Sequence, residues 1–239
     1  MAEVTLAGSN QVAHIVDCVL VLESDKNSPI KYLRTYKNRF GPTDEIGLFA
    51  HTERGLKAVE DPSGMLMDEG AESLSGSACT LVSEGLRQIP VEIQALAVKS
   101  TLANPRRQFS GINFQRGQIV VAICDKFLNA KLWENDVFVS TVAGISSNDP
   151  QLDMALAVAI MSSLKNKVSS KRTMYIGELG LTGQVRGSFL IDGKIKEAIR
   201  LGFERVVVPA SSRKAVTVKS SSNFEIIYVS KVSDLLRII

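Results

Sequence analysis

Two short basic stretches carry the residues of this sequence that could contact phosphate groups. The first is KNRFG, which comprises Lys37, Asn38, Arg39, Phe40 and Gly41. Lys37 and Arg39 alternate at the end of an expected strand, so both should point to one side. Gly41 and Pro42 favour a turn. Cations placed in this way could reach phosphate oxygens; the alternative interpretation is the polar end of a hairpin.

The second stretch is NPRR, residues 104–107, whose Arg106 and Arg107 are candidates for DNA binding together with Arg116, which follows further along the chain. A guanidinium group matches two phosphate oxygens with its fork of donors. Phe109 and Phe114 lie close in sequence and could stack on bases. We expect residues 104–111 to form a basic loop. The competing interpretation is a solvated loop with ordinary surface arginines.

The sequence gives little support for acid–base catalysis, metal binding or nucleotide binding. Glu45 and Glu178 each stand alone in a glycine-flanked turn, so neither has a second carboxylate at a defined spacing. His14 and His51 are isolated, which predicts no metal site. A GxxxxGK[ST] phosphate loop is absent, since the nearest approach, residues 187–194, has one residue too many.

The cysteines predict a reducing environment. Cys18, Cys79 and Cys124 are far apart and odd in number, and no CxxC occurs. We therefore expect buried thiols without disulfide bonds or structural zinc.

The first sixty residues are typical of a β-rich unit. Expected strands are DCVLVLES (17–24), IKYLRTY (30–36), and the hairpin made by IGLFAHT and GLKAV, with a polar loop at 37–45. Residues 61–75 contain Gly and Ser without clear periodicity, so they predict a linker.

Residues 76–239 indicate a longer α/β unit. ACTLVSE, QIPVEIQALAV, DVFVSTVAG, RVVVP and FEIIYV are expected strands, and MYIGELGLTGQVR an expected hairpin. FQRGQIVVAICDKFL, NDPQLDMALAVAIMSSL, DGKIKEAIRLGF and VSDLLRII are expected helices. Asp149 is the expected N-cap residue of the second of these helices, with Pro150 at the first helical position. Gly202 suits the left-handed position after a helix end.

The bulk composition sets outer limits. The chain has 239 residues, 45% of them hydrophobic and 22% charged, with a formal net charge of +3. These values are ordinary for a globular protein of one or two domains. No apolar stretch approaches the ~20 residues of a membrane span, and no secretory signal is evident. The mild basicity permits a nucleic-acid partner without requiring one.

KNRFG followed by DEIGLF, together with GELGLTGQVR and KEAIRLGFERVVVPA, resembles the RadA (Sms) family of DNA-repair proteins. VEIQAL followed by NPRR supports the same resemblance, which runs over essentially the whole chain. The family combines a zinc finger, a RecA-like ATPase core and a Lon-protease-like domain. The resemblance implies an α/β (α+β) fold: residues 1–60 as the C-terminal strands of the ATPase core, 61–75 as the linker, and 76–239 as the Lon-like domain.

Lon-type proteases use a Ser–Lys pair, in which a desolvated lysine takes the proton of the serine hydroxyl. By resemblance, the serine position at the helix start after Pro150 is occupied by Gln151, and the lysine position by Asp192. Both partners are replaced, which predicts a degenerate dyad without catalytic residues. Asp192 is expected to be an N-cap. Lys194 and Lys196 are nearby, but no serine occupies the matching helix start.

The resemblance implies part of an ATP-dependent DNA translocase that promotes branch migration in recombinational repair. The Lon-like unit would bind DNA and support oligomerisation without proteolysis, and KNRFG would couple the ATP state to DNA movement. The chain itself would not be catalytic. One alternative is a Lon-like peptidase with an unusual dyad; another is a protein-interaction module that docks a recombinase.

Cofactors and partners are likewise implied. We expect no cofactor in this chain, with ATP, Mg and zinc belonging to N-terminal parts of the family. The implied partners are single-stranded and branched DNA, a RecA-type recombinase and other copies in a hexamer, without a membrane. The bacterial cytoplasm is the expected location, with an organelle as the alternative.

Overall fold

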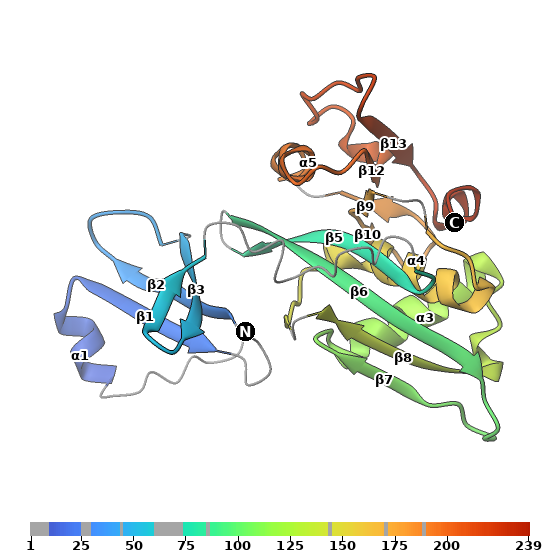
Figure 1. Cartoon of the computed structure of the whole chain (residues 1–239), viewed down its shortest axis with the longest axis horizontal. Coiled ribbons are helices and arrows are strands. Elements are labelled where there is room, and N and C mark those ends of the chain that lie inside the picture. The colour runs from blue at the N-terminus through green and yellow to red at the C-terminus, as the bar shows by residue number, and fades with distance from the viewer. Residues whose placement is uncertain are drawn as a thin grey trace. The chain divides into compact units, whose positions relative to one another are not determined.

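The computed structural model places the chain in two compact units. It describes residues 10–24, 30–43, 45–59, 74–84, 87–142, 145–169, 172–187 and 190–239. One unit comprises residues 1–62 with 83–87, and the other residues 63–82 with 88–239 (Figure 1). Most of the expected linker, residues 61–73, lies outside the described residues.

The first unit is an antiparallel sheet in the order β1-β2-β3-β4. Its strands are β1 (Cys18–Ser24), β2 (Ile30–Asn38), β3 (Ile46–Thr52) and β4 (Gly55–Ala58). Ile30 and Leu48 are its buried apolar residues among those described. A short helix that the sequence analysis did not predict, α1 (Asn10–Ile15), precedes the sheet. The N-terminal part of the expected 37–45 loop instead belongs to β2.

The second unit is built on a seven-stranded mixed sheet in the order β13-β12-β9-β5-β6-β8-β7. Its strands are β5 (Ser77–Glu84), β6 (Arg87–Lys99), β7 (Arg107–Ser110), β8 (Asn135–Thr141), β9 (Thr173–Tyr175), β12 (Arg205–Pro209) and β13 (Glu225–Val229). The strands from β13 to β5 pair in parallel, and β7 pairs in parallel with β8. A separate two-stranded ribbon consists of β10 (Glu178–Leu179) and β11 (Val185–Arg186). The expected mixed α/β fold is confirmed.

In the described part of the second unit, the α-helices α3 (Phe114–Leu128), α4 (Asp153–Lys165) and α5 (Ile191–Arg200) pack on this sheet. Helix α4 is buried along nearly its whole length, because every residue from 153 to 162 is buried. Helix α5 is amphipathic, and its apolar stripe joins residues of β5, β9, β12 and β13 in one core cluster. Gly202 follows α5 with φ of +79°, as its sequence position predicts. No helix among the described residues is long and apolar enough to cross a membrane.

Four local predictions were wrong. Residues 107–110 form the edge strand β7, so the expected basic loop is in large part a strand. The first residues of the expected 174–186 hairpin belong to the main sheet as part of β9, and within this stretch only β10 and β11 form a hairpin pair. The closing helix is a 3-10 helix, η6 (Val232–Arg237). Cys18 is exposed, whereas Cys79 and Cys124 are buried as expected.

Helix α3 lies close against β7 at Gly117. A Cβ atom at Gly117 would lie 2.5 Å from ring carbons of Phe109, which is inside any normal contact distance. The Phe109 ring also meets Phe114 edge-on, with ring centroids 5.8 Å apart. Phe109 and Phe114 therefore pack together at the junction of β7 and the start of α3.

Gly117→Ala should destabilise the protein, because the added methyl group must displace a packed ring. We expect a loss of roughly 1–3 kcal/mol in the free energy of unfolding, measured by urea titration. Gly193→Ala is the matched control: it also lies in a helix, but a Cβ there meets nothing within 4 Å. The control should be neutral or stabilising by up to about 1 kcal/mol. Equal effects of both substitutions would contradict the close approach.

Candidate functional site

Gln151, one of the two expected positions of the degenerate dyad, lies in the turn that leads into helix α4. Asp149 caps a short 3-10 turn, η4 (Pro150–Leu152), and its Oδ1 accepts a hydrogen bond from the Gln151 N–H at 2.9 Å. The predicted N-cap at Asp149 and the predicted Pro150 position are confirmed. Gln151 is only 5% exposed, and its Oε1 is buried without a hydrogen-bond partner. Its side chain is therefore packed into the protein and offers no nucleophile.

Lys194 lies on the buried side of α5, and its ammonium group binds two oxygens. Nζ donates to the Leu81 carbonyl at 2.8 Å and lies 3.1 Å from Asp149 Oδ2. Its side chain is fully buried. Burial lowers the pKa of Lys194, while the Asp149 carboxylate acts in the opposite direction.

The contacts of Lys194 differ from those of a catalytic lysine. A general base must reach the hydroxyl of its nucleophile at about 2.6–3.2 Å, and Lys194 instead contacts a carboxylate and a carbonyl. The hydroxyl of Ser147, nearby in the preceding loop, accepts a hydrogen bond from the Asp149 N–H. Lys196, the other nearby lysine, pairs with Asp192 at 2.8 Å.

Asp192 does not cap helix α5, so that expectation was wrong. The helix begins at Ile191 with Leu190 as its N-cap residue. The Asp192 carboxylate accepts hydrogen bonds from the Thr217 N–H at 2.6 Å and the Thr217 hydroxyl at 2.9 Å. The hydrogen bond from Lys196, supported by those from Thr217, lowers the pKa of Asp192 to about 2. Asp192 therefore anchors the loop before β13.

Arg116, an expected DNA-binding residue, forms a fork-shaped ion pair with Asp153. Arg116 Nε donates to Asp153 Oδ1 at 2.8 Å, and Nη2 donates to Asp153 Oδ2. Asp153 is fully buried and also accepts the Leu179 N–H at 3.0 Å. Arg116 Nη2 lies 3.5 Å from Glu178 Oε1. The pair thus connects the first turns of α3 and α4 to β10.

Burial raises the pKa of Asp153 to about 6, although Arg116 and Leu179 act to lower it. The reciprocal hydrogen bond to Asp153 raises the pKa of Arg116. The carboxylate therefore depends on Arg116 to stay ionised in the interior. No chemistry was expected of Glu178, and Asp153 was not among the expected site residues. The aspartate that begins the otherwise apolar DMALAVAIM run is the sequence feature that could have indicated a buried carboxylate.

The other two expected arginines differ in what they contact. The Arg107 guanidinium donates to the carbonyls of Asn135 and Leu132, both at 2.5 Å, and burial lowers its pKa. Arg107 thus fastens β7 to the segment that begins β8. Arg106 is exposed, and its backbone N–H donates to Asp136 Oδ1 at 2.7 Å.

The KNRFG segment comprises the last two residues of β2, Lys37 and Asn38, and the turn that follows them. Lys37 Nζ donates to the carbonyls of Ala13 at 2.8 Å and Val16 at 2.7 Å, so it closes the C-terminal end of α1. Arg39 pairs with Asp17 at 3.1 Å. Lys37 and Arg39 therefore face one side, as expected, and there they bind α1 and the residues that follow it.

The remaining KNRFG residues complete the turn. Asn38 Oδ1 accepts the Phe40 N–H at 3.1 Å, and Asn38 Nδ2 donates to the Pro42 carbonyl. A Cβ at Gly41 would lie 2.9 Å from Asn38 Nδ2, so the turn leaves little space there. Phe40 is 84% exposed, which makes the ring the accessible part of the motif.

Metal chemistry has no visible basis in the described segments. Within them, no group of three or more His, Cys, Asp and Glu residues is placed to hold a metal ion.

The class of protein follows from comparison with known families. Residues 82–212, more than half of the chain, match the family described as subunit ChlI of Mg-chelatase, and the chain belongs to that family. The matched segment runs from the end of β5 through α3, α4 and α5 to the turn after β12.

Nearly the entire chain is also similar to proteins named DNA repair protein RadA. The chain is 38% identical to the one from Escherichia coli over 234 residues, 36% to that of Halalkalibacterium halodurans over 233, and 35% to that of Streptococcus pneumoniae over 235. Each match covers 98% of this chain. The chain spans 50–56% of the length of these relatives. The resemblance to the RadA family is confirmed.

Arg116→Ala should destabilise the protein in a pH-dependent way. The folded-state pKa of Asp153, about 6, lies above its unfolded value, so this carboxyl favours the fold while protonated. That contribution is lost as the pH rises through the folded pKa, and the loss grows when Arg116 is absent. We expect the free energy of unfolding to fall by roughly 3–5 kcal/mol at pH 8 and by clearly less at pH 5.

Urea unfolding at both pH values measures this effect. Arg205→Ala serves as the control, because it removes an arginine from an exposed pair with Glu225 at 3.3 Å. It should cost less than about 1 kcal/mol at either pH. A loss for Arg116→Ala that is the same at pH 5 and pH 8 would contradict the dependence of Asp153 on Arg116.

Proposed function

We propose that this chain is part of a DNA-repair protein of the RecA-like ATPase family. In this proposal the second unit is a non-proteolytic platform that binds DNA and assembles with other copies. The similarity of nearly the whole chain to proteins named DNA repair protein RadA supports the role in repair. ATP, Mg and zinc would be bound by parts of the whole protein that lie outside this chain.

The observation that carries the non-proteolytic role is the contact between Lys194 and Asp149. A lysine that holds a carboxylate at 3.1 Å and a carbonyl at 2.8 Å in a buried position is committed to structure. Gln151 stands where the nucleophile would be and is buried. A hydrolase fold can serve as a binding surface once its chemistry is absent, so the function should reside on the exterior of the unit.

The finer assignments extend this proposal. The whole protein would translocate on DNA and promote branch migration in the bacterial cytoplasm, in cooperation with a RecA-type recombinase. The second unit would form a hexameric ring with other copies. The KNRFG turn, Lys37 to Gly41, would take part in coupling ATP state to DNA movement. Of the three expected DNA-binding arginines, Arg106 is the exposed one.

Arg106→Ala should weaken DNA binding and reduce its salt dependence. If Arg106 contacts one phosphate, its loss should lower the slope of log K against log salt concentration by about 1. Fluorescence anisotropy with single-stranded and branched DNA over a salt series measures both quantities. Arg107 and Arg116 are unsuitable for this test because their guanidinium groups support the fold.

Arg205→Ala is the matched control, since it removes the same charge from an exposed position of β12. Strand β12 lies near the edge of the sheet opposite to β7. It should leave the slope unchanged. Equal losses from both variants would mean that net charge alone attracts DNA, and an absence of binding by the unmodified chain would overturn its role as a DNA-binding platform.

Asp149→Ala should lower the free energy of unfolding by about 3–5 kcal/mol, because it leaves the buried Lys194 ammonium group unpaired. Lys194→Met should lower it less, because methionine fills the same apolar space without a charge and the Asp149 carboxylate keeps the Gln151 N–H. The folded Lys194→Met protein should bind DNA as the unmodified chain does. Urea titration and DNA anisotropy measure the two effects. Hydrolysis of an unfolded protein substrate by the unmodified chain, abolished in Lys194→Met, would favour the peptidase alternative over the platform.

A further inference from the structure

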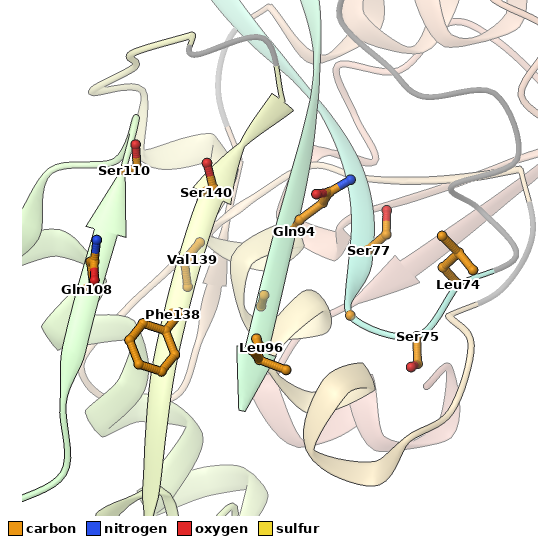
Figure 2. Close-up of a pocket in the computed structure, with 12 residues that line it drawn as sticks. Leu74, Ser75, Ser77, Gln94, Leu96, Gln108, Ser110, Phe138, Val139 and Ser140 are labelled. Carbon is orange, nitrogen blue, oxygen red and sulfur yellow. The ribbon is translucent and has the colours of Figure 1, made fainter. Parts of the chain in front are cut away.

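One face of the sheet in the second unit is hollowed over strands β5, β6, β8 and β7. Figure 2 shows side chains from all four segments turned toward this hollow, with helices behind the strands. The cavity has a volume of about 510 Å³. Among the described residues that line it, none is charged: Leu74, Ser75, Gly76, Ser77, Gln94, Ala95, Leu96, Gln108, Ser110, Phe138, Val139 and Ser140.

The strand register places an apolar centre in this hollow. Leu96 of β6 pairs with Phe138 of β8, and Phe138 pairs in turn with Gln108 of β7. Because alternate residues of a strand share a face, these side chains lie opposite Phe109, which packs on α3. Leu96 is 53% exposed and Phe138 is partly exposed. A flat ring and an aliphatic side chain thus form an accessible floor.

Neutral hydrogen-bonding groups surround the floor. Gln94 and Ser77 are both oriented by the buried Glu92 carboxylate, whose Oε1 accepts from Gln94 Nε2 at 2.8 Å and from the Ser77 hydroxyl at 2.9 Å. Ser140 lies opposite Gln94, and Ser110 lies beside Ser140 on β7. Amides and hydroxyls can both donate to and accept from the edges of nucleic-acid bases.

Basic side chains lie near both ends of the hollow, beside β7 at one end and beside the segment that leads into β5 at the other. At the β7 side, Arg106 is exposed and directly precedes the strand, two residues before Gln108. At the β5 side, the Ser75 hydroxyl donates to Asn166 Oδ1 at 3.1 Å, and Asn166 lies between the exposed Lys165 and Lys167. Asp136 is the acid beside Arg106, and its carboxylate is occupied by the Arg106 N–H.

We propose that this hollow binds a single strand of nucleic acid that runs across β5, β6, β8 and β7. A base stacks on Phe138 and Leu96, neighbouring base edges meet the amides and hydroxyls, and phosphates lie toward Arg106 and toward Lys165 and Lys167. The assignment rests on the proposed DNA-binding function and adds to it the place where a single strand binds and the residues that contact its bases. The uncharged floor between two cationic ends fits a strand whose phosphates are at the rim.

The test uses the full chain and oligodeoxythymidylate as the probe. Phe138→Leu keeps an apolar side chain but removes the stacking face, so affinity should fall by roughly tenfold with the salt slope unchanged. Phe49→Leu is the matched control: Phe49 is also a partly exposed strand phenylalanine, but it lies in β3 of the other unit. It should bind as the unmodified chain does.

A second variant reports contact directly. Trp133, the single tryptophan of the sequence, is replaced by phenylalanine, and Phe138→Trp is added, so that fluorescence comes from position 138 alone. Addition of oligodeoxythymidylate should quench this fluorescence at the concentrations at which it binds. Duplex DNA should quench it less, because paired bases cannot stack on the ring.

The outcomes separate this inference from the proposed function. DNA binding with no effect of Phe138→Leu and no quenching would overturn the single-strand site and leave the DNA-binding platform intact. A variant that changes the sedimentation of the protein but not its affinity for DNA would assign the hollow to contact between copies, and would also overturn it. If the unmodified chain binds no DNA, both the platform and the single-strand site are wrong.

Discussion

The arrangement of the second unit depends on the contacts that the buried Lys194 ammonium group makes with Asp149 and with the Leu81 carbonyl. An unpaired charge in a protein interior costs several kcal/mol, so Lys194 can lie there only if Asp149 and the Leu81 carbonyl hold it. Those contacts fix the position of α5 relative to β5 and to the entry of α4. Asp149 caps the first turn leading into α4 at the same time. One ion pair therefore positions three elements.

A second buried pair supports the same region from the other side. Asp153 begins α4, and Arg116 binds it from the first turn of α3. Four ionisable groups thus surround one helix start, and each has a partner in the described structure. Catalysis by a Ser–Lys pair needs the opposite condition, a lysine whose amine is free to accept a proton beside a hydroxyl. The polar groups that would suit chemistry are used to stabilise the fold.

The sequence predicted the elements of this region better than it predicted their contacts. Periodicity and capping residues located α3, α4, Asp149 and Gly202, because these depend on local rules of helix formation. The ion pairs join residues far apart in sequence, and no local rule connects Arg116 to Asp153. Lys194 gave a readable signal, since it lies on the apolar stripe of α5 with Ile191, Ile195 and Ala198. The spacing shows that this lysine must be buried, but not that Asp149 is its partner.

Strand β7 shows a different limit of sequence reasoning. Arg107 and Phe109 point to one face and Gln108 and Ser110 to the other. A four-residue segment that begins with Arg107 and follows Asn104, Pro105 and Arg106 is nevertheless typical of a loop. The strand exists because β8 offers a parallel partner and because Arg107 binds carbonyls of the segment before β8. Tertiary context decides such short edge strands.

In both units, basic side chains are bound within the protein while an aromatic ring stays accessible. In KNRFG, Lys37 and Arg39 are occupied by α1 and Asp17, and the exposed group is the Phe40 ring. In the second unit, Arg107 and Arg116 are occupied by carbonyls and by Asp153, and the accessible floor of the hollow carries Phe138. These four basic side chains, which a count of charges would assign to phosphate binding, instead contact other parts of the chain. If the chain binds DNA as proposed, its affinity should therefore depend less on salt than the number of arginines and lysines in the sequence would indicate.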